Sequence, residues 1–352
     1  METKSIKQWI LDLCGLMSVS GSESYDENKL MELVRPFFDS VERDPVGNYL
    51  FIKKSRRENA PRLLLDTHYD EIGMMVREIL EGGFVRITNI GGLDPRILPA
   101  AEVVLYGEKP VFGVIVSTPP HLQKPGESSK LQDVRDLLID TGYTKETLEK
   151  ILPIGSPVGY MPRYTELEGG ELAGKSMDNK ACGACVIKAL SETDPDELAA
   201  DVYVLFSAKE ESSSTAGANV GAYRADPDYA MCIDVNLGKT PDVSKDETVE
   251  LGKGISLTYG PVVSRKLTDR TAELCRNAGL NVQPYIATRS TGTNTVKIVL
   301  GRAGIPTVDV GLPLKYMHTY NEVLVLKDAE DLCRLVREFV CDARIAEEFR
   351  RG

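Results

Sequence analysis

The sequence predicts an α/β protein in which helices flank a mixed sheet and a small all-β domain is inserted. Apolar strands alternate with amphipathic helices through residues 1–70 and again through residues 165–352, which is the rhythm of a helix-covered sheet. Between them, residues 71–164 carry short alternating apolar segments, Gly-Gly pairs and repeated prolines, a texture typical of hairpins. The length of 352 residues also exceeds the roughly 250 to 300 residues at which a single core stops growing. We therefore expect one principal domain interrupted by a β-rich insertion.

Composition excludes several classes of protein. The charged fraction of 27% and the hydrophobic fraction of 42% lie near the averages of about 25% and 45% for globular chains, so we expect an ordered core. A net charge of −11 disfavours nucleic acid as a partner because no excess of cations exists to neutralise phosphates. No stretch approaches the roughly 20 apolar residues of a membrane span, and the first residues lack the apolar run of a signal peptide. Seven cysteines, an odd number, do not indicate a disulfide framework, so we expect a cytoplasmic protein with no membrane partner.

The first elements follow from apolar periodicity. A helix is predicted at the start because apolar residues recur three and four apart: Ile6, Trp9, Ile10, Leu13, Leu16 and Met17. A second helix is expected to open at Ser24, with Glu27 completing a capping box. Strands are predicted over residues 49–53 and 62–66, and the run Leu63-Leu64-Leu65 in the latter suits a sheet covered on both faces.

After the insertion the α/β rhythm returns. The expected elements are a helix over 179–192, strands over 201–206 and 229–234, a helix over 264–277 and a strand over 305–310. A final helix buries Leu332, Leu335, Val336 and Phe339, with Asp328 placed to cap it. Cys182 and Cys185 have the spacing of a redox or half-zinc motif, but no second pair follows, so we interpret them as core residues.

Histidine is the most informative residue type because the chain has only three. His68 and Asp70 are two residues apart at the end of a predicted strand, so both can face one site. A ligating histidine needs a partner for its other ring nitrogen, and Asp70 can supply one. The alternative is a buried histidine beside a surface acid, and the pattern alone does not choose between them.

Further acids and a second histidine occupy similar positions. Asp178 precedes an apolar helix, where a helix cap is the simpler interpretation. Glu210 and Glu211 follow a predicted strand, at the edge where α/β proteins place their sites. Two adjacent glutamates can serve one site in different roles only if the backbone bends there. The alternative is a solvated acidic loop. Asp234 ends another apolar strand, and His318 follows a later one, where it can equally be an exposed loop residue.

Taken together, these residues favour a metal site. Two histidines and several carboxylates at strand ends of one sheet form the mixed nitrogen and oxygen set that suits zinc, cobalt or manganese. Two ions roughly 3.5 to 4 Å apart need a bridging carboxylate and about two further ligands each, which this set can supply.

The order of the motifs resembles the tetrahedral aminopeptidase family of two-metal peptidases, also called the glutamyl aminopeptidase family. The likeness runs nearly end to end. It comprises Ser20-Gly21-x-Glu23, Gly47-Asn48, His68-x-Asp70-Glu71-Ile72-Gly73, Pro120-His121-Leu122, Asp140-x-Gly142, Lys175-x-x-Asp178, Glu210-Glu211, Asp234, Tyr316-Met317-His318 and Glu322.

The resemblance implies a function and an assembly. It implies an aminopeptidase with two divalent ions per subunit, zinc first and cobalt or manganese next, that removes the N-terminal residue of short peptides through a metal-bridged water. The implied roles are Asp178 bridging both ions, His68 and Asp234 on one ion, Glu211 and His318 on the other, Glu210 as general base and Asp70 orienting His68. The family further implies that the insertion makes dimer contacts and that six dimers form a hollow dodecamer.

Some positions depart from the family pattern. Asn179-Lys180 stands where Asp-Arg is common, and Thr291-Gly292-Thr293-Asn294 replaces a usual Gly-Thr-Asp run, which bears on substrate preference, metal affinity and turnover. Three alternatives remain: a two-metal deacylase of N-acyl amino acids, a glycoside hydrolase that needs two carboxyl groups and no metal, and an inactive assembly homologue. Lys315 and Arg289 are candidates to select acidic N-terminal residues.

Overall fold

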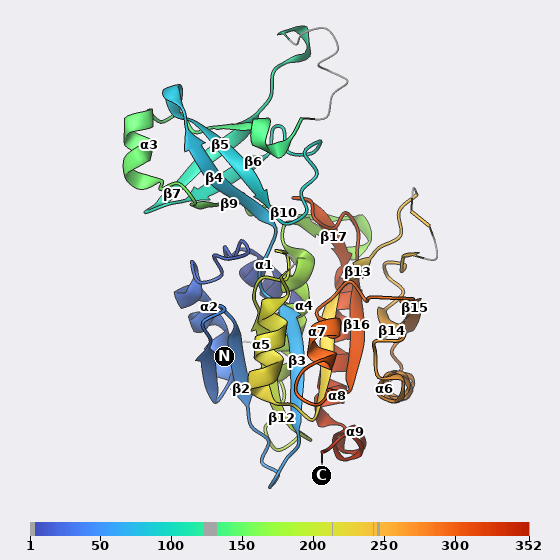
Figure 1. Cartoon of the computed structure of the whole chain (residues 1–352). Coiled ribbons are helices and arrows are strands. Elements are labelled where there is room, and N and C mark those ends of the chain that lie inside the picture. Colours follow the sequence, from blue (N-terminus) through green and yellow to red (C-terminus); the bar gives the residue numbers. More distant parts are fainter. Residues whose placement is uncertain (1–3, 123–131, 213, 242, 245–246, 352) are drawn as a thin grey trace.

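The protein has a larger α/β body, which carries both termini, and a smaller β-rich lobe above it (Figure 1). The computed structural model describes residues 4–122, 132–212, 214–241, 243–244 and 247–351. Among these residues, no helix is both long enough and apolar enough to cross a membrane.

An eight-stranded sheet forms the centre of the body. In spatial order its strands are β1 (Ser40–Arg43), β2 (Tyr49–Lys53), β12 (Asp201–Ser207), β3 (Arg62–His68), β13 (Tyr229–Leu237), β16 (Thr307–Leu314), β14 (Ile255–Tyr259) and β15 (Val282–Ile286). The central strands β12, β3, β13 and β16 run parallel, whereas β12 pairs with β2 and β16 pairs with β14 in the antiparallel sense. The predicted α/β class with a mixed sheet is therefore confirmed.

Helices cover both faces of this sheet. One face packs against α1 (Ile6–Cys14), α4 (Met177–Ser191), α6 (Arg265–Asn277) and α8 (Leu326–Cys341), and the other packs against α5 (Ala216–Ala225) and α7 (Thr295–Val299). Leu63 and Leu65 of β3 point into the first core and Leu64 points into the second, as the alternation along a strand requires. The remaining helices of the body are α2 (Glu27–Val34) and α9 (Ala343–Glu348).

The β-rich lobe is a closed barrel with its own apolar core. Its strands are, in order around the barrel, β4 (Gly73–Ile79), β5 (Phe84–Ile90), β8 (Leu138–Asp140), β7 (Pro110–Val116), β6 (Glu102–Tyr106) and β9 (Pro157–Tyr160), with the short helix α3 (Lys145–Ile151) alongside. A three-stranded sheet of β10 (Tyr164–Leu167), β11 (Glu171–Gly174) and β17 (Glu322–Val325) lies between this barrel and the body (Figure 1).

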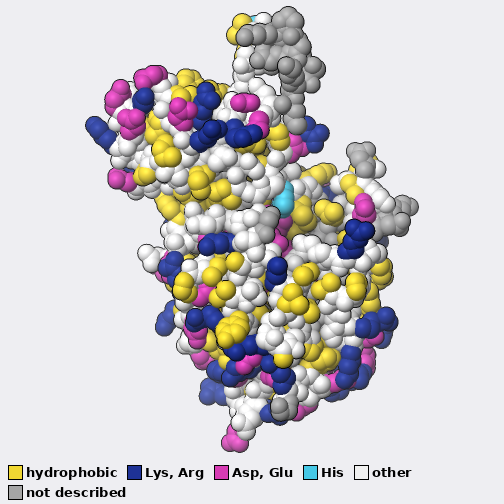
Figure 2. All heavy atoms as spheres, in the orientation of Figure 1, with side chains coloured by type: hydrophobic (Ala, Val, Ile, Leu, Met, Phe, Trp, Pro, Cys, Tyr) yellow, Lys and Arg dark blue, Asp and Glu magenta, His cyan; other side chains and the backbone are white. Residues whose placement is uncertain are grey.

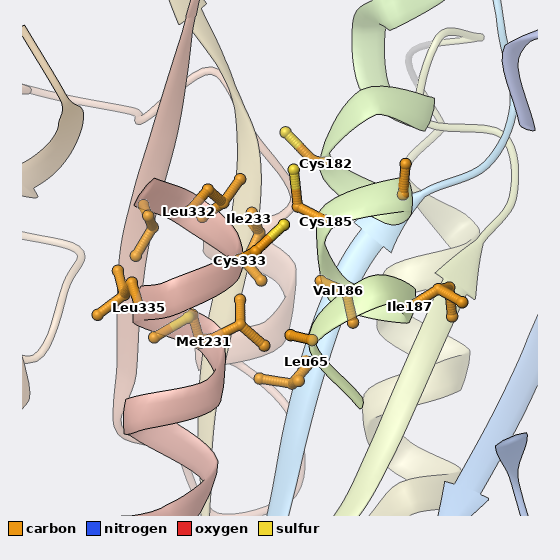
Figure 3. Packing of buried hydrophobic residues seen from close by; sticks show 14 of the residues in the cluster. Leu65, Cys182, Cys185, Val186, Ile187, Met231, Ile233, Leu332, Cys333 and Leu335 are labelled. Carbon is orange, nitrogen blue, oxygen red and sulfur yellow. The ribbon is translucent and has the colours of Figure 1, made fainter. Parts of the chain in front are cut away.

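The contact between α4 and α8 contains three cysteines (Figure 3). Cys182 and Cys185 of α4 and Cys333 of α8 are free and buried among apolar side chains such as Met231 and Leu65. The interpretation of the two α4 cysteines as core residues is confirmed.

Two predicted caps are wrong. The second helix begins at Glu27, not Ser24, and its first flanking residue, Asp26, uses its carboxylate to accept the N–H of Met17 at 2.8 Å. The side chain of Asp328 lies within the first turn of α8 and accepts the N–H groups of Gly252 and Gly254. In both cases a backbone segment outside the helix offers donors that the helical pattern does not reveal.

Candidate metal centre

The predicted ligands meet at the carboxyl ends of parallel strands, where α/β proteins place their sites. His68 is the last residue of β3, Glu211 follows β12, and Asp234 lies in β13. Asp178 enters from the start of α4, and His318 follows β16. All five residues predicted as metal ligands are thus brought to one place.

Asp178 lies between the two histidines. Its Oδ1 is 3.0 Å from His68 Nε2, and its Oδ2 is 3.4 Å from His318 Nε2. His68 Nε2 is also 3.7 Å from Asp234 Oδ1, and His318 Nε2 is 3.2 Å from Glu211 Oε2. Each oxygen of Asp178 therefore belongs to a different half of the site.

The residues fit divalent cations. Candidate ligand atoms of His68, Asp178 and Glu211 all lie within 4.8 Å of one another, and tetrahedral ligands about 2.1 Å from zinc are themselves roughly 3.4 Å apart. Glu211 Oε1 is buried and has no hydrogen-bond partner among the described residues, a costly state for a carboxylate oxygen unless a cation or water satisfies it. Imidazole and carboxylate donors are the set that zinc, cobalt and manganese accept.

The candidate ligands shift one another's pKa values. Burial alone would lower the pKa of His318, but hydrogen bonds to Asp178 and Glu211 raise it to about 11. Burial alone would raise the pKa of Asp178, yet hydrogen bonds from His318 and His68 hold it well below its usual range. Since metal ligands must be deprotonated, cation binding at this site releases protons.

Asp70 holds its neighbours in a way that the sequence did not predict. His68 Nδ1 is 3.0 Å from the backbone carbonyl oxygen of Asp70, whereas the Asp70 carboxylate is farther, at 3.7 Å. The two carboxylate oxygens instead accept the N–H groups of Glu210 and Glu211, each at 3.0 Å. The backbone of Asp70 thus fixes the imidazole, and its side chain fixes the two glutamates.

Glu210 lines the cavity beside the candidate ligands. Its pKa is raised to about 7: burial raises it most, the charge on His68 lowers it, and nearby carboxylates, Glu211 first, also raise it. The cavity measures about 380 Å³ and is lined by His68, Asp178, Glu210, Asp234, Val235, Asn236, Leu237, Tyr285, Ser290, Thr291, Gly292, Thr293, Met317 and His318. A carboxyl group that titrates near neutrality in a cavity is suited to proton transfer.

On the surface, a histidine and acidic side chains are visible where the barrel meets the body (Figure 2).

Glu322 has a supporting position that the sequence did not reveal. Its Oε2 accepts the N–H groups of Met177 and Asp178 at 2.6 and 3.1 Å, and its Oε1 accepts that of His318 at 3.0 Å. One buried carboxylate therefore holds the backbones of two candidate ligands. The only local signal was an acid at the start of the apolar strand β17.

The two asparagines that depart from the family pattern support the fold around the site. Asn179 Nδ2 donates to the carbonyl oxygen of Ile233 at 2.8 Å. Asn294 Nδ2 donates to Asp66 Oδ2 and Ser207 Oγ at 3.1 and 2.9 Å. The amide NH2 groups of both residues are thus engaged with groups other than the candidate ligand side chains, whereas their buried Oδ1 atoms have no partner among the described residues.

Comparison with known proteins identifies the family. The profile of the M42 glutamyl aminopeptidase family matches residues 47–335. The chain belongs to this family. The resemblance inferred from the order of its motifs is therefore confirmed, and the M42 chain is an aminopeptidase. Membership of this family implies divalent metal ions, and a buried group of His68, Asp178 and Glu211 could bind one.

Similar proteins span nearly the whole M42 chain. The lysyl aminopeptidase of Pyrococcus furiosus is 29% identical over 325 residues, which cover 91% of this chain and 92% of that protein. The TET aminopeptidase from a marine sediment Thaumarchaeota archaeon has a TM-score of 0.89 with 27% identity and covers 98% of each chain. The Pyrococcus horikoshii TET1 peptidase has a TM-score of 0.82 with 25% identity and covers 96% of this chain and 99% of that one.

Proposed function

We propose that the protein is a dinuclear metal-dependent aminopeptidase that removes the N-terminal residue of short peptides. The observation that carries this proposal is the position of Asp178 between the two histidines, one facing each carboxylate oxygen. That arrangement suits a carboxylate shared by two cations. The unpartnered, buried Oε1 of Glu211 supports the same reading.

The ligand assignment follows the distances. His68 and Asp234 would hold one ion, Glu211 and His318 the other, and Asp178 would bridge them. When bound, zinc, cobalt or manganese would polarise the scissile carbonyl and supply a bridging water with a pKa lowered toward about 7.

Glu210 would act as the general base. It lines the cavity and forms no ion pair with a described lysine or arginine, and its raised pKa places it near the operating pH. It takes a proton from the attacking water and returns it to the amine that leaves. Asp70 keeps the backbone of Glu210 in place through the hydrogen bond to its N–H. The carboxylates in the cavity also favour entry of a cationic peptide N-terminus.

Substitution of the base tests this assignment. Glu210→Gln is expected to lower kcat for aminoacyl anilides at least about 100-fold, because the amide cannot accept the proton. Bound metal, measured by elemental analysis, should remain at the parent level, since Glu210 is not an assigned ligand. Glu330→Gln, an exposed change on α8, is the control and should match the parent. A Glu210→Gln enzyme as fast as the parent would contradict the role.

The cavity wall favours uncharged N-terminal side chains. Apart from the assigned ligands and base, its described residues are neutral, including Asn236, Leu237 and Tyr285. Lys315, a candidate cation from the sequence, bonds instead to Glu171 at 2.9 Å, and Arg289 is absent from the lining. The wall also offers no cation for the free carboxylate of an N-acyl amino acid, which disfavours the deacylase alternative.

A substrate panel tests this preference. Alanyl, leucyl, glutamyl and lysyl anilides, with N-acetylated amino acids alongside, should be assayed with zinc, cobalt or manganese added. We expect kcat/KM to be highest for the neutral anilides and negligible for the acylated compounds. Hydrolysis of a glycoside that survives removal of metal by a chelator would instead favour the glycoside hydrolase alternative, and metal binding without any turnover would favour an inactive homologue.

We also propose that residues 71–164 form a dimerisation domain. This domain is inserted between the two parts of a catalytic domain made of residues 1–70 and 165–352. The dimers would then assemble into a dodecamer. The Pyrococcus horikoshii TET1 peptidase assembles into a tetrahedron or a large octahedral shell. Phe112 and Val114, two residues apart on β7, are exposed on the barrel to 60% and 42%, which supports a contact with another copy.

A further inference from the structure

The segment that carries Glu210 and Glu211 is held by an unusual set of hydrogen bonds. Four successive backbone N–H groups, from Ala208 to Glu211, each donate to a side-chain oxygen. The acceptors are Asn48 Oδ1 for residue 208 at 2.9 Å, Glu23 Oε1 for residue 209 at 3.2 Å, and the two oxygens of Asp70 for the glutamates. We call Asn48, Glu23 and Asp70 the amide cradle.

The cradle holds a bend that the chemistry requires. Lys209 has a φ of +64°, in the left-handed region that non-glycine residues rarely adopt. Adjacent side chains on a straight strand point to opposite faces, whereas this turn lets Glu211 reach His318 and Glu210 line the cavity. The two glutamates can therefore serve one site in different roles.

Each member of the cradle is itself buried and fixed. Asn48, Glu23 and Asp70 are exposed to only 1%, 4% and 0%. Asn48 Nδ2 donates to Asp44 Oδ2 at 2.6 Å and to the carbonyl oxygen of Gly217 at 2.9 Å, so its amide oxygen must face Ala208. Glu23 Oε1 also accepts the N–H of Gly21 at 2.9 Å.

The opposite side of the same turn is fixed as well. The carbonyl oxygen of Lys209 accepts hydrogen bonds from Ser212 Oγ and Ser214 Oγ at 3.0 and 3.1 Å. At Gly217, a Cβ would lie 2.2 Å from the carbonyl oxygen of Ala208 and 2.6 Å from Asn48 Oδ1. A side chain at position 217 would therefore collide with the turn and with Asn48.

From this geometry we infer that Glu23 and Asn48 are positioning residues for catalysis, because they set the direction of Glu210 through the backbone of residues 208–209. Neither residue lines the cavity or touches a candidate ligand side chain. The inference rests on the proposed aminopeptidase function. Asp70 holds the N–H groups of both glutamates independently of Glu23. Because Lys209, whose N–H Glu23 accepts, directly precedes Glu210, loss of Glu23 should disturb the base more than the ligand.

The test uses three substitutions of Glu23 in the full chain. Glu23→Ala removes the acceptor, and Glu23→Asp withdraws it by one methylene while keeping the charge. Glu23→Gln retains an oxygen in nearly the same position and is the matched control. Because misplacing a catalytic group by about 1 Å can cost 100-fold in rate, we expect kcat to fall about 10- to 100-fold in the first two variants. KM should stay within about threefold, the sign of an interaction that matters in the transition state.

Two measurements separate positioning from a loss of fold or of metal. Metal content by elemental analysis should equal that of the parent, and Glu23→Gln should retain kcat within about threefold. Amide hydrogen exchange of a peptide covering residues 206–212 should be faster in Glu23→Ala than in the parent. This readout does not depend on activity. If Glu23→Ala does not fold, Glu23→Asp supplies the same comparison.

The outcomes distinguish the two proposals. A parent enzyme that hydrolyses no aminoacyl anilide refutes the proposed function, while the exchange measurement still reports on the cradle. An active parent with full kcat and unchanged exchange in Glu23→Ala and Glu23→Asp overturns the positioning role. An equal loss of kcat in Glu23→Gln and Glu23→Ala also overturns it, because the acceptor oxygen would then not be what matters.

Discussion

At the scale of single residues, the environment of Glu210 predicts how the rate depends on pH. Its pKa is raised to about 7, chiefly by burial, and a nearby divalent cation would favour the charged form and lower that value. The base acts only when deprotonated. We therefore expect kcat/KM to fall about tenfold per pH unit on the acidic side of a midpoint at or below about 7. A pH profile of the metal-loaded enzyme, corrected for metal content at each pH, measures this midpoint; a rate that rises as the pH drops to 5 would contradict it.

The site residues differ in how far the sequence could predict them. His68, Asp178, Glu211, Asp234 and His318 could be predicted as candidate ligands, because most of them lie at strand ends and the order of motifs along the chain set them apart from ordinary acids and histidines. Their meeting in space is now visible.

Residues that act on backbone atoms were not predictable in the same way. Glu23, Asn48 and Glu322 were part of the family likeness, but nothing in their spacing indicated what they bind. Each accepts N–H groups from a segment more than 100 residues away, and such a contact exists only after the chain has folded.

At the scale of elements, the apolar pattern located the strands but not their ends. The predicted strands over 62–66 and 229–234 continue to His68 and Leu237. In β3 the polar residues Thr67 and His68 still pair with Phe206 and Ser207 of β12, because backbone hydrogen bonds continue past the last apolar side chain. The hydrophobic pattern therefore does not predict the strand ends, which are where candidate ligands such as His68 lie.

The buried side chain of Glu71 joins its own segment to the start of α4 and to the segment that contains Ser18. Its carboxylate lies 2.5 Å from Lys175 Nζ and 3.3 Å from Lys180 Nζ, and it accepts the N–H of Ser18 at 3.0 Å. Burial alone would raise the pKa of Glu71, but the two ammonium groups lower it to about 2. A carboxyl whose pKa is lower in the folded state stabilises the fold above its unfolded pKa of about 4.3, and that contribution is lost as the pH falls toward 2.

Substitution of Glu71 tests this junction. Glu71→Gln leaves two buried ammonium groups without their anion, and breaking a buried ion pair in this way costs about 3 to 5 kcal/mol. Denaturant unfolding at pH 7 measures the loss, and the difference from the parent should shrink as the pH is lowered below about 4.5. Asp269→Asn, which breaks an exposed pair with Arg265, should cost less than about 1 kcal/mol. Equal costs for the two variants would contradict the role of Glu71.

At the scale of the whole molecule, the site lies where the barrel lobe meets the body. A Cβ on Gly92 would lie 3.1 Å from His318 Nδ1, and one on Gly91 would lie 3.3 Å from the carbonyl oxygen of Glu211. The sequence presented this Gly-Gly pair only as a turn in the β-rich segment. It is also the place where the barrel approaches two candidate ligands closely, so the barrel forms part of the surroundings of the candidate metal centre.

The outer face of the barrel provides the last prediction, which concerns assembly. Phe112 and Val114 project from the same side of β7 and are exposed to 60% and 42%. If this face contacts a second copy, Phe112→Asp combined with Val114→Asp places charges in an apolar interface, and the assembly should dissociate. Mass photometry of the parent should show a large homo-oligomer and that of the double variant a much smaller species.

The control for this prediction is an exposed apolar residue on the body. Leu300→Asp, at a position that is 70% exposed, should leave the assembled mass unchanged. Because Phe112 and Val114 lie outside the barrel core, the thermal midpoint of the dissociated double variant should reflect only the loss of subunit contacts. A double variant with the mass of the parent would exclude this face as the contact, and a parent that is monomeric at micromolar concentration would exclude the assembly itself, since oligomer stability depends on protomer concentration.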